Sequence, residues 1–298
     1  MSAYLSLDPM DLPIPKRHAY LLTAVAPRPI AFASTIDKEG RVNLSPFSFF
    51  NVFSSNPPVM IFSPAKSGLT GKQKDSYLNV KEVPEVVINI VNHPIVEQMS
   101  LSSTGYERGV NEFVKSGLTE LASDLVKPPR VAEAPVAFEC RVDQVIELGE
   151  EGASGNLVIC RVLKMHFREE YLDADQKLDT EKLDLVGRMG GSWYTRSSGS
   201  SLFEIPKPIR KKGIGIDQLP ASIRHSEILS GNNLGRLGNV EKLPNEAEIT
   251  EVGQEQALLK LKQRFVGKDL GTALHKLAKQ ELEKGNTDKA LKILLQKY

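Results

Sequence analysis

The sequence predicts a mainly β protein, built as an antiparallel barrel or sandwich, with a helical extension at its C-terminal end. Short runs of apolar and β-branched residues follow one another closely between residues 17 and 175. Turns rich in Gly, Pro and Asn separate these runs, and no regular alternation of strand and helix is present, which argues against a parallel sheet. From residue 255 onward, apolar residues instead recur at helical spacing.

Strand-like runs are expected at residues 29–36, 42–53, 59–63, 86–91, 136–148 and 157–167. The first two are expected to form a hairpin, because the turn between them ends in Gly40. An Asn-Pro-Pro sequence breaks the chain before the third run, and a Gly-rich turn joins the last two. Short helices are expected between strands, at residues 74–83 and 94–100.

The C-terminal third has a different character, and a boundary is predicted between a domain at 1–209 and an extension at 210–298. Residues 210–250 are rich in Gly and Asn and are interpreted as an irregular linker. The helical segment presents apolar faces formed by Leu258, Leu261 and Phe265, by Leu274, Leu277 and Ala278, and by Leu291, Leu294, Leu295 and Tyr298. Gly285 is expected to end one helix, and Thr287 or Asp288 to cap the next. These helices are expected to pack on the barrel or on a second copy, and a partner-binding module is the alternative.

Composition and charge exclude several classes of protein. The chain is 41% hydrophobic and 25% charged with a net charge of +1, so no strong field favours nucleic acid or an acidic membrane. No run of 18 apolar residues and no secretory leader pattern is present, so a cytoplasmic protein is predicted. Cys140 and Cys160 both fall in apolar strand patterns and are predicted to be buried thiols.

Familiar catalytic and metal motifs are missing. Gly213 and Gly215 lack the third glycine and the preceding strand of a dinucleotide fingerprint. Residues 68–72 are too short for a phosphate-binding P-loop. The five histidines are far apart and show no metal-ligand spacing, so no metal site and no catalytic side chain are predicted.

What remains is a set of polar residues at strand ends, which comprises Ser34, Thr35, Asn43, Ser45, Ser48, Ser63, Lys74, Asp75 and Ser76. In one interpretation these groups satisfy local backbone, as Ser and Thr often do. In the other they bind a planar ligand with a phosphate tail. A phosphate prefers hydroxyls, a lysine and the free N–H groups of a helix start, whereas a flat ring prefers apolar walls with a few donors. Pro46 lacks an N–H, so neighbouring N–H groups could face such a ligand.

Several motifs occur in the order found in one known family. They are residues 28–35 (RPIAFAST), 40–50 (GRVNLSPFSFF), 57–58 (PP), 74–79 (KDSYLN), 111–113 (NEF), 127–130 (KPPR), 139–140 (EC) and 187–194 (GRMGGSWY). With these motifs the chain resembles the flavin reductase-like family, which includes flavoredoxins, over roughly residues 15–208. The resemblance implies a six-stranded antiparallel split β-barrel that binds FMN, usually as a homodimer.

The resemblance also implies roles for individual residues. Those expected along the ribityl chain and ring edge are Ser34, Thr35, Ser45, Pro46, Phe47 and Ser48, and those near the phosphate are Ser63, Lys74, Asp75 and Ser76. Asn43 is also expected to bind the cofactor. Position 76 is Thr in the family pattern, and Ser keeps the hydroxyl. Arg28 and Tyr194 are expected either to touch the flavin or to shape the barrel.

The implied function is hydride transfer from NADH or NADPH to FMN, and then electron transfer to free flavin, a ferric chelate or a redox partner protein. The flavin supplies the chemistry, which agrees with the lack of a catalytic His or carboxylate pair. The alternative is a flavoredoxin-type electron carrier without NAD(P)H activity of its own.

Overall fold

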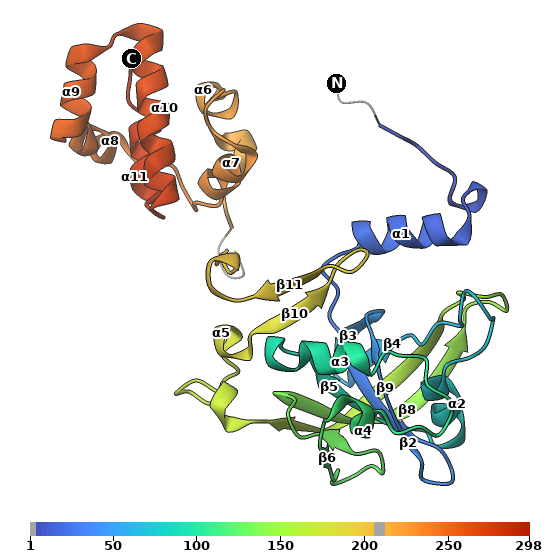
Figure 1. Cartoon of the computed structure of the whole chain (residues 1–298). Coiled ribbons are helices and arrows are strands. Elements are labelled where there is room, and N and C mark those ends of the chain that lie inside the picture. Colours follow the sequence, from blue (N-terminus) through green and yellow to red (C-terminus); the bar gives the residue numbers. More distant parts are fainter. Residues whose placement is uncertain (1–3, 206–211) are drawn as a thin grey trace. The chain divides into compact units, whose positions relative to one another are not determined.

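The computed structural model describes residues 4–205 and 212–298, which form two compact units, Met1–Phe203 and Glu204–Tyr298 (Figure 1). Each unit has its own hydrophobic core. The domain boundary predicted between residues 209 and 210 lies outside the described residues.

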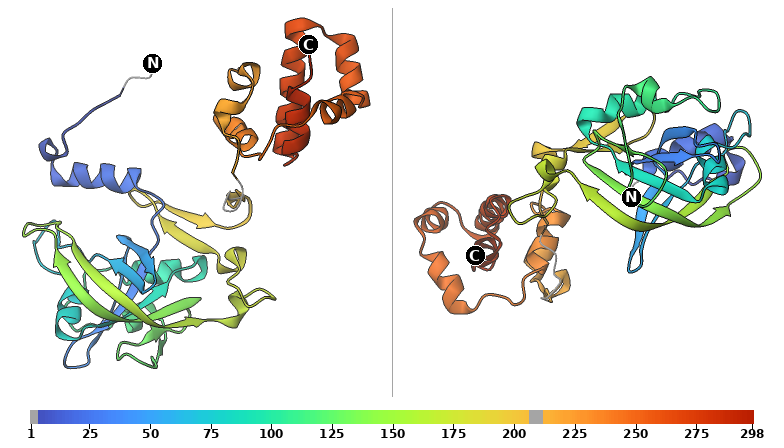
Figure 2. Two further views of the ribbon diagram at one scale, coloured as in Figure 1. Left: turned by 180° about the vertical axis from the view of Figure 1, so that it is seen from behind. Right: turned by 90° about the horizontal axis from the view of Figure 1, so that it is seen from below.

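The N-terminal unit is built on one seven-stranded antiparallel sheet. Its strands follow the order β2-β1-β5-β8-β9-β4-β3. Their bounds are β1 Ala31–Ile36, β2 Val42–Phe47, β3 Phe50–Ser55, β4 Pro58–Phe62, β5 Glu85–Ile90, β8 Val136–Glu147 and β9 Asn156–Phe167. The expected hairpin of the first two strands is confirmed, since Ala33 pairs with Ser45. The long strands β8 and β9 curve across the unit (Figure 1 and Figure 2).

The expected count of six strands is wrong, because the run at 42–53 is two strands. The chain turns at Ser48 and Phe49, and it leaves β2 on one edge of the sheet and starts β3 on the other. Two residues span only about 7–11 Å, so the sheet must curl until its two edges approach each other there. β2 and β3 do not pair, and the sheet is therefore a curled, split structure and not a closed barrel.

Alternate residues of the strands face two separate cores. One core lies inside the curl and contains Phe47 and Phe62, whose ring centroids are 5.4 Å apart, together with both cysteines. Cys140 and Cys160 are buried free thiols, as predicted, and burial raises the pKa of Cys140 to about 12. The other core contains Phe32 and lies beneath the short helices α3 Val96–Leu101 and α4 Glu112–Ser116.

Helix α2, Asp75–Glu82, packs over β1 and β2 close to where a helix is expected. A further helix, α1 at Ile14–Ala24, is not predicted by the sequence, since it has no buried residue and hence no clear apolar stripe. A hairpin of β10 and β11 is also not predicted. The remaining elements are β6 Glu120–Leu121, β7 Arg130–Val131, α5 Thr180–Leu183, β10 Leu185–Arg188, β11 Tyr194–Ser197, and the 3₁₀ turns Pro9–Asp11, His93–Ile95, Glu169–Tyr171, Gly199–Ser201 and Ile216–Gln218.

The C-terminal unit is all helical. Its helices are α6 Ala221–Arg224, α7 Gly231–Gly238, α8 Glu246–Gly253, α9 Gln256–Arg264, α10 Gly267–Glu283 and α11 Thr287–Leu294. The interpretation of residues 210–250 as an irregular linker is therefore wrong over α6, α7 and α8. All three helices are short, so each gives too few turns for a clear periodic signal. Ser230 caps α7 and Asn245 caps α8.

The apolar faces predicted for the C-terminal helices are covered inside their own unit. Leu258, Leu274 and Leu291 are at most 1% exposed and lie in one cluster with Ile223 of α6 and Leu237 of α7. These three leucines need no cover from the barrel or from a second copy, because the unpredicted helices provide it. Packing of the whole unit on the barrel or on a second copy stays a prediction.

Two glycines of this unit have distinct structural roles. A Cβ on Gly213 would lie 2.6 Å from the carbonyl oxygen of Gly238, so this glycine lets two backbone segments touch. Gly285 has a φ of +85° and ends α10, as predicted. The N-cap of α11 was expected at Thr287 or Asp288, but it is Asn286. The side-chain amide of Asn286 donates to Glu281 at 2.8 Å and does not cap the first turn of α11. Within the described ranges, no helix has both the length and the apolarity that a bilayer crossing needs.

Candidate functional site

A polar network lies where β1 and β2 meet the first turns of α2. The side-chain amide of Asn43 donates to the hydroxyl of Ser76 at 2.8 Å. The side-chain amide of Asn79 donates to the hydroxyl of Thr35 at 3.2 Å. Asn43 and Thr35 face each other across the β1–β2 pair, and all four residues are buried. The structure thus brings together three residues predicted for the site and adds Asn79.

A second polar cluster lies where β4 ends and β9 begins. The backbone N–H of Asn156 donates to the hydroxyl of Ser63 at 3.0 Å, and its side-chain amide donates to Oε1 of Gln73 at 2.8 Å. The side-chain oxygen of Asn156 is buried, and no described residue donates to it. Gln73 and Ser76 are three residues apart, so the chain entering α2 connects both clusters. The sequence did not single out Gln73 or Asn156, because neither belongs to a recognised motif.

Helix α2 begins without a side-chain cap. Its N-cap residue, Lys74, is exposed and provides no acceptor for the first turn. In the described part of the chain, nothing accepts the backbone N–H groups of Asp75 and Ser76. Since Asn43 donates to the hydroxyl of Ser76, the proton of that hydroxyl is free to donate elsewhere. Two N–H groups and a hydroxyl therefore lie at a positive helix end whose N-cap residue is a lysine, and this arrangement suits an anion.

The carboxylate of Asp75 lies at this helix start and is balanced by an arginine that the sequence did not indicate. Arg108 Nη1 is 3.7 Å from Asp75, and its Nη2 is 3.2 Å from Glu82. Arg108 belongs to the loop between α3 and α4, so only the folded structure places it against α2. Its charge offsets Asp75 and keeps the helix start favourable for an anion.

The N–H groups beside Pro46 do not behave as the sequence analysis expected. The backbone N–H of Leu44 points outward from the edge strand β2 and donates to Glu112 Oε2 at 2.9 Å. N–H directions alternate along a strand, so the N–H of Ser45 points toward β1. Burial raises the pKa of Glu112, although the Leu44 N–H lowers it. Pro46 thus occupies an outward position on an edge strand, where a missing N–H costs little.

Neighbouring residues of β1 and β2 point to opposite faces of the sheet. Ser34 and Thr35 are both fully buried, but only Thr35 lies on the face of Asn43 and Ser76. The hydroxyl of Ser34 has no partner among the described residues. The ring of Phe47 packs inside the curl, so any ligand contact of this residue is through its backbone.

Arg28, Ser48 and Tyr194 lie at the other end of β2, about 16 Å from Asn43 at the usual rise per strand residue. Arg28 Nε donates to the hydroxyl of Ser48 at 3.3 Å. The guanidinium carbon of Arg188 lies 4.6 Å from the centroid of the Tyr194 ring. Tyr194 is 37% exposed. The predicted residues therefore divide between the start of α2 and the Ser48 turn at the far end of β2.

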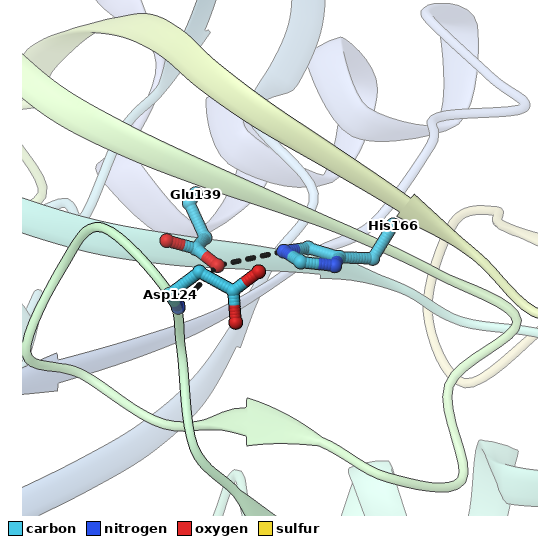
Figure 3. Close-up of side chains that lie close together, drawn as sticks. All are labelled: Asp124, Glu139 and His166. Atoms are coloured by element: carbon cyan, nitrogen blue, oxygen red, sulfur yellow. Dashed lines mark hydrogen bonds and ion pairs between the residues drawn. The ribbon is translucent and has the colours of Figure 1, made fainter.

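A separate group of charged residues fixes the loop before β7 (Figure 3). The carboxylate of Glu139 is fully buried and accepts the backbone N–H groups of Asp124, Leu125 and Val126 at 2.8, 2.6 and 3.2 Å. His166 Nε2 lies 2.6 Å from the same carboxylate. Burial raises the pKa of Glu139, but the hydrogen bonds from Asp124, Leu125 and His166 outweigh it and lower the pKa overall. Glu139 is therefore ionised and acceptor-only, so His166 Nε2 carries the hydrogen.

Asp124, Glu139 and His166 have ligand atoms within 4.8 Å of one another, but the contacts favour a structural role over a metal site. Four donors already occupy the oxygens of Glu139. The carboxylate of Asp124 is paired with the ammonium of Lys164. A divalent cation would have to displace both sets of contacts.

A cavity of about 320 Å³ opens beside His166, away from the polar networks. Its polar lining includes Arg130, which donates to the carbonyl of Ala122, and Arg168, which pairs with Glu170 at 3.0 Å. No residue predicted for the site lines this cavity, so it is not part of the candidate site.

The fold and the site define a curled antiparallel sheet protein with an uncapped helix start, which suits an anion, at its strand ends. The sequence model of the flavin reductase like domain matches residues 24–182. A protein of Aquifex aeolicus is 34% identical over 185 residues, which cover 62% of this chain and 92% of that protein. The chain therefore belongs to the flavin reductase-like family.

Solved structures agree with this assignment. Nitrilotriacetate monooxygenase component B from Bacillus cereus is 28% identical with a TM-score of 0.64, over 69% of this chain and all of that chain. A split-barrel protein of the flavin reductase type from Shewanella frigidimarina is 22% identical with a TM-score of 0.56, over 67% and 96% of the two chains. The family match ends at residue 182, so it covers none of the C-terminal unit.

Proposed function

We propose that this protein binds FMN and works as an NAD(P)H-dependent flavin reductase. The observation that carries the proposal is the uncapped start of α2, with Lys74 and the free hydroxyl proton of Ser76 beside two unpartnered N–H groups. Membership of the flavin reductase-like family makes a flavin the ligand to expect at that place.

The residues at α2 fit the phosphate of FMN. An anion there would receive the backbone N–H groups of Asp75 and Ser76, the hydroxyl of Ser76 and the ammonium of Lys74. Arg108 neutralises Asp75, which would otherwise repel the phosphate. The buried side-chain oxygen of Asn156 has no donor among the described residues and would accept a hydrogen bond from a ribityl hydroxyl or a water molecule.

The Ser48 end of β2 fits the ring. Phe49 is 41% exposed there and offers an apolar surface, and the half-buried hydroxyls of Ser45 and Ser48 are available as donors. Bound FMN would supply the hydride and electron chemistry. The protein's part is to hold the phosphate at one end, to orient the ring at the other and to limit the access of water.

The experiment is anaerobic mixing of the FMN-loaded protein with NADH or NADPH while the flavin absorbance is followed. Bleaching in a single rapid phase that saturates with the nucleotide supports a reductase. Bleaching by dithionite but by neither nucleotide would replace this proposal with the alternative, a flavoredoxin-type electron carrier. The final acceptor is then identified by supplying free flavin or a ferric chelate to the reduced protein.

We further propose that the protein is a homodimer. Helix α1 has no buried residue and exposes Tyr20 and Leu21, while β3 exposes Val52 and Phe53. Apolar side chains on one helix and one edge strand suit an isologous contact with a second copy. Light scattering should give twice the mass of one chain, and a monomer mass would contradict this. The cytoplasmic location remains a prediction.

A further inference from the structure

Arg28 is a buried arginine whose hydrogen bonds all go to neutral groups. The residue is 6% exposed, and its Nε donates to the hydroxyl of Ser48 at 3.3 Å. Its Nη1 donates to the carbonyl oxygens of Leu22 and Val25, and its Nη2 donates to that of Met189 at 3.1 Å. These contacts use four of the five N–H groups of the guanidinium. The fifth N–H group has no acceptor among the described residues, and none of the four acceptors carries a formal charge to balance the guanidinium.

The charge of Arg28 is only partly balanced. No carboxylate of the described residues forms an ion pair with Arg28, and residues 1–3 and 206–211 contain no acidic residue. Leu22 and Val25 lie at the C-terminal end of α1, where the helix dipole supplies roughly half a negative charge. Arg188 lies against Arg28 through two backbone hydrogen bonds of 2.9 and 3.0 Å and adds a second positive charge. Burial lowers the pKa of Arg28, and the charge of Arg188 lowers it further.

A buried cation without a counter-ion is costly unless the functional state brings an anion to it. Helix α1 and the β10–β11 hairpin meet at Arg28, so the charge is fixed and not carried by a mobile side chain. Among the described residues, Ser48 is the one side chain that accepts a hydrogen bond from Arg28, and it lies at the ring end of the proposed flavin site. The charge therefore faces the place where the ring would lie.

We propose that Arg28, assisted by Arg188, stabilises the negative charge that hydride transfer leaves on the bound flavin. This inference rests on the proposed function. A hydride brings two electrons and one proton, so the nicotinamide leaves as a cation and the flavin gains one negative charge. Arg28 acts through its fixed charge and through Ser48, and it is a positioning residue.

The test is the midpoint potential of the bound flavin, measured by anaerobic spectroelectrochemistry in Arg28→Gln, Arg28→Lys and the unchanged protein. Loss of the charge in Arg28→Gln should weaken the binding of reduced FMN by about tenfold relative to oxidised FMN. That change corresponds to a potential about 30 mV lower for a two-electron couple. Arg28→Lys keeps the charge and should stay close to the unchanged protein.

Arg196→Gln is the matched control. Arg196 lies in the same hairpin and bonds to Asp184 at 2.7 Å, but its side chain is 52% exposed, so water screens the change in charge that its removal causes. Its removal should leave the potential unchanged. An equal potential in Arg28→Gln and the unchanged protein would overturn the inference and leave Arg28 as a cap for α1.

Arg28→Gln removes four hydrogen bonds, and circular dichroism shows whether it folds. If it does not fold, Arg188→Gln decides, since this variant removes the adjacent charge and leaves the contacts of Arg28 in place. A lower potential in Arg188→Gln supports the inference, and an unchanged potential overturns it. Failure of the unchanged protein to bind FMN at all is a separate result, which overturns the proposed function.

Discussion

Asn43 donates from its side-chain amide to the hydroxyl of Ser76 at 2.8 Å, and this bond ties an edge strand to the first turn of a helix 33 residues later. The bond also orients the hydroxyl of Ser76, because an oxygen that accepts from Asn43 can turn its own hydrogen toward a ligand. The proposed phosphate site thus depends on the pairing of β1 with β2, which places Asn43 opposite Thr35.

Lys74→Ala should weaken FMN binding by roughly 1–3 kcal/mol, the range for a lost charge-assisted hydrogen bond. The stability of the apoprotein should not change, since Lys74 is exposed and caps nothing. Flavin fluorescence titration gives the affinity. Lys81→Ala is the control, because Lys81 is an exposed lysine in the last turn of the same helix. This variant should bind FMN as tightly as the unchanged protein. Equal affinities in both variants would remove Lys74 from the site.

Glu139→Gln should lower the free energy of unfolding by about 3 kcal/mol, since a buried acceptor of four hydrogen bonds is replaced by an amide that can accept at only one oxygen. Because the folded-state pKa of Glu139 is lowered, its contribution is full above the unfolded pKa of about 4.3 and is lost as the pH falls through the folded value. Urea denaturation at pH 7 and below pH 4.3 measures both effects. The variant should lose less stability on acidification than the unchanged protein, and an identical loss would refute the assignment.

Leu274→Ala should destabilise the C-terminal unit by about 2–5 kcal/mol, because Leu274 is fully buried in the core of that unit. FMN affinity should stay the same, since each unit has its own core. Helical circular dichroism follows the first property, and flavin fluorescence follows the second. A loss of FMN affinity in the folded variant would show that the helical unit contributes to the flavin site.

Strand patterns and motif order predicted most of the N-terminal unit, and physical reasons explain the misses. The run at 42–53 is apolar and extended throughout, so nothing in its sequence marks the turn at Ser48 that sends β3 to the far edge of the sheet. Helix α1 buries none of its residues and therefore carries no periodic signal. In the C-terminal unit, residues 210–250 suggested an irregular linker, but α6, α7 and α8 are too short to give a periodic signal. Gly213 does lie outside any helix or strand, and it permits a backbone contact with Gly238.

The candidate site was predictable only where its residues belong to motifs. Thr35, Asn43 and Ser76 lie in motifs and meet in the structure. Gln73, Arg108 and Asn156 come from three other segments and join them only through folding. Whether a carboxylate balances the charge of Arg28 could not be judged from sequence, because this depends on which side chains lie near Arg28 in the folded protein.

The most direct test of this account compares FMN with riboflavin, which differ only in the phosphate. Isothermal titration calorimetry of the apoprotein with each flavin should give a Kd for FMN that is roughly 10- to 100-fold lower than the Kd for riboflavin. That difference should largely vanish in Lys74→Ala. Riboflavin binding as tightly as FMN to the unchanged protein would contradict the assignment of the phosphate to the start of α2.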